Sequence, residues 1–259
     1  LMSYETAKRA IDFLVSNCDD SVGTLRIQFF GGEPLMNFEL IKQVIVCCKL
    51  ITKKIGIKFN FGISTNCTLL TEEVQDFLVE NRFGVLLSID GDEETHNYQR
   101  PFRDGRASYR QVIDNALSLN RKFLENKCGI PRIRANLING TASQLAKFTE
   151  MFTKMGFRSI DVAPIISRPG DANRHALDMK AWEEWYKQSD EQLIEWLEHA
   201  VNDEIIENSY INRQVQRKLS LLESQRLFGG VRCGVCRNTS IVDADGNIFP
   251  CHRYPGLDR

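Results

Sequence analysis

The sequence has no marked excess of charge of either sign and no long apolar run. Its 259 residues carry a formal net charge of −1 at pH 7, with basic and acidic residues interleaved, so it presents no broad positive surface for nucleic acid or an anionic membrane. No apolar stretch approaches the roughly 18 residues that a membrane-spanning helix needs, and the first residues lack the pattern of a signal peptide. We therefore expect a cytoplasmic protein with a neutral or peptide-like partner.

Both ends of the sequence fall within patterned segments. The chain begins with Leu1, and residues 4–15 already show helical periodicity. At the other end, eight residues follow Cys251 in a cysteine-rich segment. We expect the sequence to be a piece of a longer protein.

The apolar run of residues 25–30 ends abruptly at Gly31 and Gly32. Glycine lets a ligand approach the backbone closely, and Glu33 adds a carboxylate at the end of the predicted strand. Pro34 stops the strand, and a segment of helical period follows at once. Ligands bind at this rim in α/β proteins, so the segment is a candidate ligand site. An ordinary strand-to-helix turn is the alternative.

Predicted strands and helices alternate along the first two thirds of the chain. This alternation predicts parallel strands with right-handed crossovers, hence an α/β fold that is either a doubly wound sheet or a barrel. The strands are expected at residues 25–30, 58–64, 84–91, 132–138 and 159–166, and the helices at 4–17, 38–55, 71–80, 107–126 and 144–154.

Polar or glycine residues end four successive predicted strands, at 31–33, 64–66, 88–91 and 136–139. Four such ends in a row favour a ring of strands around one site over a single crevice. We therefore predict a partial TIM-like barrel. The predicted domains are the barrel in residues 1–170, a helical connector in 171–229 and a cysteine-rich module in 230–259.

Three of the eight cysteines crowd together near the C-terminus. Cys233, Cys236 and Cys251 lie within nineteen residues, and His252 follows the last of them. In a cytosolic protein such crowding indicates a metal or cluster site more than disulfides. Thiolates hold iron–sulfur clusters, but the same cysteines with His252 also have the spacing of a tetrahedral zinc site. Residues 243–253 form a plausible hairpin that brings distant thiols together.

Several segments resemble motifs of the radical S-adenosylmethionine (SAM) enzymes. Residues 29–38, Phe-Phe-Gly-Gly-Glu-Pro-Leu-Met-Asn-Phe, resemble the Gly-Gly-Glu-Pro motif that holds the methionine end of SAM. Residues 64–71 and 87–91 resemble the endings of the third and fourth barrel strands, 96–109 the loop that follows, and 161–165 the later strand beside the adenine. The resemblance implies a partial (β/α)6-type barrel of the radical SAM kind.

The resemblance also implies a set of cofactor-binding residues, although it assigns no catalytic one. Gly31 and Gly32 would offer backbone carbonyls to the methionine ammonium, aided by Glu33, and Arg100 is a candidate partner for the SAM carboxylate. The implied set is Gly31, Gly32, Glu33, Pro34, Thr65, Asn66, Ser88, Asp90, Arg100, Val162 and Pro164.

The C-terminal cysteines resemble the opening of a SPASM module, the auxiliary iron–sulfur domain of radical SAM peptide-modifying enzymes. This implies Cys233, Cys236 and Cys251 as ligands of an auxiliary 4Fe–4S cluster. The Cys-x-x-x-Cys-x-x-Cys triplet that holds the SAM-cleaving cluster of the family does not occur in the sequence. We therefore expect this chain alone to be inactive.

Family resemblance implies a maturase that generates a 5′-deoxyadenosyl radical and abstracts hydrogen from a ribosomally made peptide or protein. An electron donor such as ferredoxin or flavodoxin would serve it. A thioether cross-link is the first expected product, and formylglycine formation as in sulfatase maturation the second. The alternatives are a non-catalytic barrel that binds SAM or a peptide, and a metal-independent barrel enzyme with a zinc-binding tail.

Overall fold

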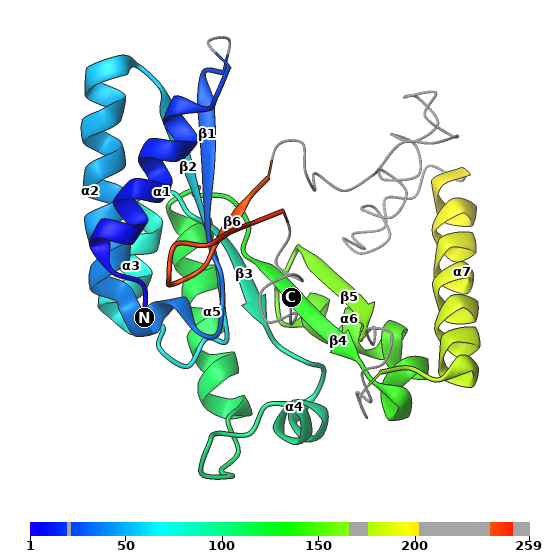
Figure 1. Ribbon diagram of the computed structural model, residues 1–259. Coiled ribbons are helices and arrows are strands. Elements are labelled where there is room, and N and C mark those ends of the chain that lie inside the picture. Colours follow the sequence, from blue (N-terminus) through cyan, green and yellow to red (C-terminus); the bar gives the residue numbers. More distant parts are fainter. Residues whose placement is uncertain (20–21, 166–175, 202–238, 251–259) are drawn as a thin grey trace.

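Five parallel strands form one sheet whose order follows the chain, β1-β2-β3-β4-β5. They are seen in a computed structural model that describes residues 1–19, 22–165, 176–201 and 239–250 (Figure 1). A doubly wound sheet would reverse direction at a switch point, whereas a sequential order is that of a (β/α) barrel. The predicted α/β fold is confirmed. The strands are β1 (Thr24–Phe29), β2 (Lys58–Thr65), β3 (Gly84–Ser88), β4 (Arg132–Leu137) and β5 (Ile160–Pro164).

Each predicted helix of the barrel region forms, within a few residues of its expected bounds. Capping explains several of these bounds: Thr71 accepts a hydrogen bond from the Val74 N–H before α3, and Gly56 ends α2 in the left-handed conformation. The helices are α1 (Tyr4–Ser16), α2 (Phe38–Ile55), α3 (Glu72–Glu80), α4 (Glu93–Gln99), α5 (Tyr109–Glu125), α6 (Leu145–Lys154) and α7 (Met179–Val201), with short 3₁₀ turns η1 (Pro34–Asn37) and η2 (Asn139–Gln144).

The segment expected as a loop at 96–109 is partly helical, so that prediction is wrong for its first residues. Asp92 caps α4 by accepting a hydrogen bond from the Thr95 N–H, and two glutamates fill the first turn. A helix of seven residues is too short to show apolar periodicity, which is why a loop was expected here.

The two faces of the sheet differ in polarity. Side chains such as Ile63, Leu87 and Ile133 are fully buried and pack with residues of the surrounding helices in the main core. The alternating positions are polar: Ser88 lies beside Arg134 in the register. Because side chains alternate along a strand, this pattern places one face against the helices and leaves the other for polar groups.

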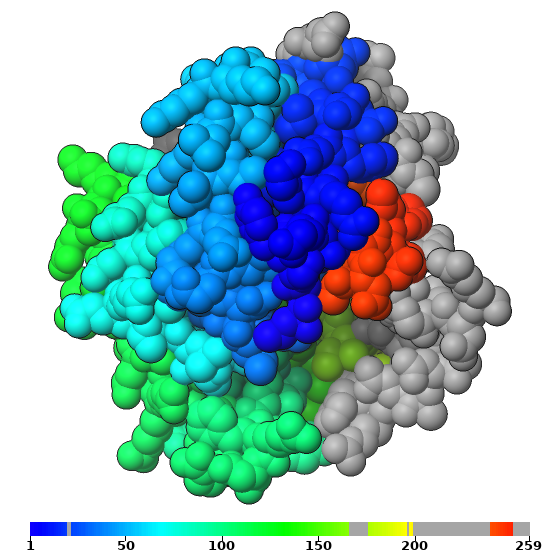
Figure 2. Space-filling view, turned by 60° about the vertical axis from the view of Figure 1, so that its left-hand side comes forward, coloured from blue at the N-terminus to red at the C-terminus, as the bar shows by residue number. Residues whose placement is uncertain are grey.

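A small hairpin from the cysteine-rich region lies against the N-terminal helix. Strands β6 (Ile241–Val242) and β7 (Ile248–Phe249) pair antiparallel, as predicted, and the Asp243 carboxylate accepts hydrogen bonds from the Asp245 and Asn247 N–H groups in the turn. Figure 2 shows this hairpin in red beside α1 in dark blue, and an added Cβ on Gly246 would lie 3.5 Å from Thr6 Cγ2.

The predicted domain division remains a prediction. Of the helical connector the structure describes residues 176–201, which contain α7, and Cys233, Cys236 and Cys251 lie outside the described residues. In the parts of the chain that the structure does describe, no helix has both the length and the apolar composition required to cross a membrane.

Candidate functional site

The carboxylate of Glu33 joins the ends of the first two strands. Its Oε1 accepts hydrogen bonds from the Leu35 N–H (3.1 Å) and from the Thr65 hydroxyl (2.9 Å). Its Oε2 accepts one from the Asn66 N–H at 2.7 Å. The side chain therefore fixes the turn after β1 to the turn after β2, in addition to any contact that it makes with a ligand.

The two glycines before Glu33 present open backbone. Gly31 and Gly32 are both exposed, and a Cβ on either would meet nothing within 4 Å. Gly31 has φ +144°, a conformation that side chains disfavour, so glycine is required there. Pro34 then starts η1. This rim has the free space and the exposed peptide groups that a polar ligand needs.

The turn after β2 is held by its own side chains. Asn66 Oδ1 accepts hydrogen bonds from the N–H (3.0 Å) and the hydroxyl (2.7 Å) of Thr68, and Thr65 Oγ1 accepts one from the Cys67 N–H. Cys67 is fully buried with φ +67°. Burial and the nearby Glu33 raise the pKa of the Cys67 thiol, so the sulfur stays protonated and acts as a core group.

An ion pair joins β3 to the end of α4. Arg100 Nε donates to Asp90 Oδ2 at 2.5 Å, and the Asn136 N–H at the end of β4 donates to Asp90 Oδ1 at 2.7 Å. The Asp90 side chain is 2 % exposed and that of Arg100 is 31 % exposed. The buried carboxylate is thus paired and fully hydrogen-bonded, which is the condition for burying a charge at acceptable cost.

A buried histidine completes this cluster. His96 Nδ1 accepts a hydrogen bond from the Asp90 N–H at 3.2 Å, which places the ring proton on Nε2. Burial lowers the pKa of His96 to about 4, so the ring is neutral near pH 7. Its Nε2 is buried and has no hydrogen-bond partner among the described residues.

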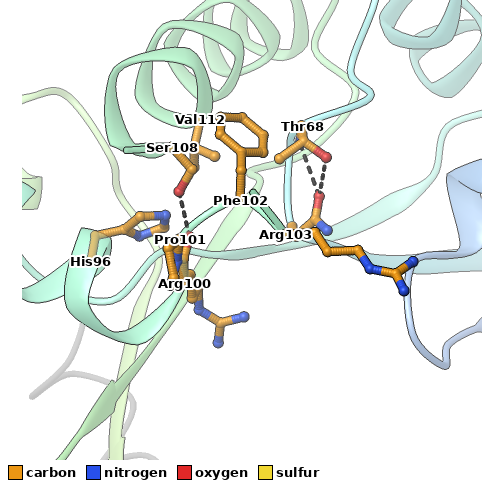
Figure 3. Close-up of a pocket in the computed structure, with 9 residues that line it drawn as sticks. Thr68, His96, Arg100, Pro101, Phe102, Arg103, Ser108 and Val112 are labelled. Atoms are coloured by element: carbon orange, nitrogen blue, oxygen red, sulfur yellow. Dashed lines mark hydrogen bonds between the residues drawn. The ribbon is translucent and has the colours of Figure 1, made fainter. Parts of the chain in front are cut away.

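A cavity of about 220 Å³ lies next to these groups. Figure 3 shows it between α4 and the turn after β2, with His96 and Thr68 on opposite sides of Phe102 in this view. The Ser108 hydroxyl donates to the Arg100 carbonyl at 2.5 Å, so the two ends of the loop between α4 and α5 are joined. The residues that line the cavity are Asn66, Thr68, His96, Arg100, Pro101, Phe102, Arg103, Ser108 and Val112.

The structure brings together the predicted site residues of the first three strands. Glu33, Thr65 and Asn66 are hydrogen-bonded to one another, and Asn66 shares the cavity with Arg100, which pairs with Asp90. Gly31, Gly32 and Pro34 adjoin Glu33, and the half-buried Ser88 ends β3 two residues before Asp90. Their contact with SAM remains a prediction.

Val162 and Pro164 are placed differently. Both are buried on β5, and the Val162 side chain belongs to the main core with 1 % exposure. A contact between Val162 and adenine could therefore come only from its backbone, and this too stays a prediction.

Sequence reasoning missed His96 as a member of the cluster. His96 lies in α4, and Arg100 follows the end of that helix; the Arg100 N–H donates to the His96 carbonyl, so the last turn keeps the two residues close together. The cap at Asp92 was the available signal for this helix.

The five cysteines that the structure describes are free thiols. Burial and the neighbouring Cys47 raise the pKa of Cys48 to about 12, so that this thiol stays protonated. Within the described ranges, no three histidine, cysteine or acidic side chains are grouped closely enough to hold a metal ion.

Comparisons with known proteins agree with the fold. The cysteine-type anaerobic sulfatase-maturating enzyme of Clostridium novyi is 25 % identical over 252 residues, covering 95 % of this chain and 62 % of that protein. The structure of native anSMEcpe with bound AdoMet, which is SAM, and Kp18Cys peptide matches with a TM-score of 0.77 and 24 % identity, covering 98 % of this chain and 67 % of that one.

A more distant structure is that of Streptococcus suis SuiB bound to precursor peptide SuiA. It has a TM-score of 0.58 and 16 % identity, and the match covers 99 % of this chain and 54 % of SuiB. These structural likenesses establish the fold, and the chain spans less than two thirds of the Clostridium novyi relative.

A family model supplies the remaining evidence. The model of the Radical SAM superfamily matches residues 4–133, which include β1 to β3, the Gly31–Pro34 rim and the Asp90–Arg100 pair. This chain belongs to the radical SAM superfamily.

Proposed function

We propose that the natural protein containing this chain is a radical SAM maturase that binds SAM at the ends of β1 to β3 and modifies a peptide or protein. The observation that carries the proposal is the Glu33 junction, in which one carboxylate fixes the open Gly31-Gly32 backbone to the polar end of β2. An ordinary strand-to-helix turn after β1 would not need hydrogen bonds from its carboxylate to the end of β2.

The described residues suit the polar end of SAM. The exposed backbone of Gly31 and Gly32 leaves space for an amino-acid moiety, and the Asn66 side-chain amide has N–H donors beyond the bonds made by its oxygen. Arg100 carries the positive charge expected opposite a carboxylate. When bound, a reduced 4Fe–4S cluster would supply the electron that divides SAM into methionine and a 5′-deoxyadenosyl radical, the species that would take hydrogen from the peptide. The work left to this chain is binding, orientation and exclusion of water.

The SAM-cleaving cluster and the auxiliary cluster would be held by different parts of the natural protein. The sequence contains no cysteine triplet, so we place the ligands of the SAM-cleaving cluster in a part of the natural protein outside it. Cys233, Cys236 and Cys251 stay the proposed ligands of an auxiliary cluster. Free thiols in the described part suit a reducing compartment, and we propose a cytoplasmic location with ferredoxin or flavodoxin as electron donor.

The comparisons favour a peptide or protein as substrate. Peptides are bound in the matched anSMEcpe and SuiB structures. The sulfatase-maturating relative aligns over 95 % of this chain, and this supports oxidation of a cysteine or serine side chain to formylglycine over the thioether cross-link that we first expected. Sulfatase-type maturation is thus the proposed reaction, with cross-linking as its alternative.

The test uses the full-length natural protein, reconstituted anaerobically with iron and sulfide, and this chain as the matched control. Electron paramagnetic resonance of the reduced samples is recorded with and without SAM. We expect a SAM-sensitive cluster signal in the full-length protein and none in the chain alone. A cysteine-containing sulfatase peptide is then followed by mass spectrometry, where loss of sulfur indicates formylglycine and loss of hydrogen with sulfur retained indicates a cross-link. Zinc without a SAM-sensitive iron signal would refute the proposal.

A further inference from the structure

Both carboxylate oxygens of Asp90 accept hydrogen bonds from groups within the protein. Its residue is 1 % exposed, and its two oxygens accept from the Asn136 N–H and from Arg100 Nε. A ligand has no surface of this carboxylate to reach. The hydrogen bond between Asp90 and SAM that the sequence implied would therefore have to be indirect.

Arg100 binds Asp90 through one of its three guanidinium nitrogens. The ion pair uses Nε, and a guanidinium carries five N–H donors in a fixed plane, so the two Nη groups keep four of them. None of the residues described in the structure accepts a hydrogen bond from these Nη groups. The side chain remains partly exposed and lines the cavity with Asn66. Its remaining donors are in the fork arrangement that binds carboxylates.

The backbone around this pair is fixed as well. The Arg100 N–H donates to the His96 carbonyl at 2.7 Å, and the Arg100 carbonyl accepts from the Ser108 hydroxyl. His96 Nδ1 in turn accepts from the Asp90 N–H. Both partners of the ion pair are thus held at backbone and side chain, and rotation of the Arg100 guanidinium is restricted mainly by the Nε bond to Asp90.

We propose that Asp90 is a positioning residue that orients Arg100 so that its Nη groups bind the carboxylate of SAM. The inference rests on the proposed function. It makes Arg100, and not the cofactor, the group that Asp90 contacts. A fixed guanidinium loses less conformational freedom when the ligand binds, and this is the physical source of the expected gain in affinity.

The test measures binding by calorimetry on the reconstituted full-length protein, with two ligands: SAM and decarboxylated SAM, which lacks the carboxylate. In Asp90→Asn the amide can place its NH₂ against the Nε–H of Arg100, which removes the acceptor and repels the donor. We expect SAM affinity to fall by roughly tenfold to a hundredfold, the range for a hydrogen bond to a charged group. Affinity for decarboxylated SAM should stay within about twofold of wild type, because orientation of the guanidinium is worth well under 1 kcal/mol without a carboxylate partner.

Three variants complete the experiment. Arg100→Ala should show the same SAM-selective loss, and adding Asp90→Asn to it should cost nothing further, because coupled residues are not additive. Arg100→Lys keeps a cation opposite Asp90 but removes the planar set of guanidinium donors. It replaces Asp90→Asn in the experiment if that variant does not fold. Asp92→Asn is the control, since it breaks the 2.6 Å pair with Lys147 two residues away while asparagine still caps α4.

The outcomes separate the inference from the proposed function. Equal weakening of both ligands by Asp90→Asn would show a general structural role and overturn the inference. An unchanged affinity in Asp90→Asn, with a loss in Arg100→Ala, would also overturn it while leaving the carboxylate contact intact. If wild-type protein does not bind SAM at all, the proposed function fails instead.

Discussion

Replacement of Glu33 by glutamine tests the junction between β1 and β2. The amide can still accept through Oε1 from Leu35 N–H and the Thr65 hydroxyl, but its NH₂ then faces the Asn66 N–H, donor against donor. One hydrogen bond to a charged group is lost, worth about 1.5–3 kcal/mol of unfolding free energy. For a domain of this size we expect the melting temperature to fall by about 5–10 °C.

The assay is thermal unfolding followed by circular dichroism, at neutral pH and fixed protein concentration. Glu39→Gln is the matched control, because Glu39 pairs with Lys42 on the surface of α2 and its side chain is 77 % exposed. An exposed pair of this kind contributes about 0–1 kcal/mol, so the control should move the melting temperature by no more than about 3 °C. The comparison isolates position, since both variants make the same chemical change.

The two variants should also differ in SAM binding in the full-length reconstituted protein. Glu33→Gln loosens the turn that carries Gly31 and Gly32, so affinity should fall, whereas Glu39→Gln should bind as wild type does. Equal melting temperatures for Glu33→Gln and Glu39→Gln would refute the reasoning, because they would mean that the hydrogen bond from the Asn66 N–H contributes nothing to the folded state.

Two further predictions concern stability. Because the pKa of His96 is lowered to about 4 in the folded protein, the unfolded chain binds the extra proton first as pH falls below about 6.5. Stability is therefore lost between about pH 6.5 and 4, and from pH 7 to 5 wild type should lose about 2 kcal/mol more than His96→Gln in urea unfolding. Gly91→Ala should cost about 2–4 kcal/mol, because Gly91 has φ +67° and an added Cβ would lie 2.4 Å from the Phe148 ring. Gly105→Ala, with φ +84° and open space, should cost only about 1 kcal/mol, and equal losses in the two would contradict the clash.

The order and type of the barrel elements can be predicted from local sequence patterns. Apolar runs of strand length, helical periodicity and capping residues are local properties, so residues 38–55 could be recognised as a helix with its observed bounds, Phe38–Ile55. Strand–helix alternation required parallel pairing, and parallel pairing placed the polar ends of β1 to β4 on one edge. The hairpin expected at residues 243–253 also forms, with its strands at Ile241–Val242 and Ile248–Phe249.

The hydrogen bonds between polar groups that are distant in the chain could not be predicted from such patterns. Glu33 meets Thr65 and Asn66 across more than thirty residues, and Asp90 takes its second bond from a backbone N–H on β4. No periodicity encodes such pairs, because they depend on the register and spacing of neighbouring strands. The same register places the Val162 side chain in the core, whereas α4, which lies between Asp90 and Arg100 in the chain, brings Arg100 back to Asp90.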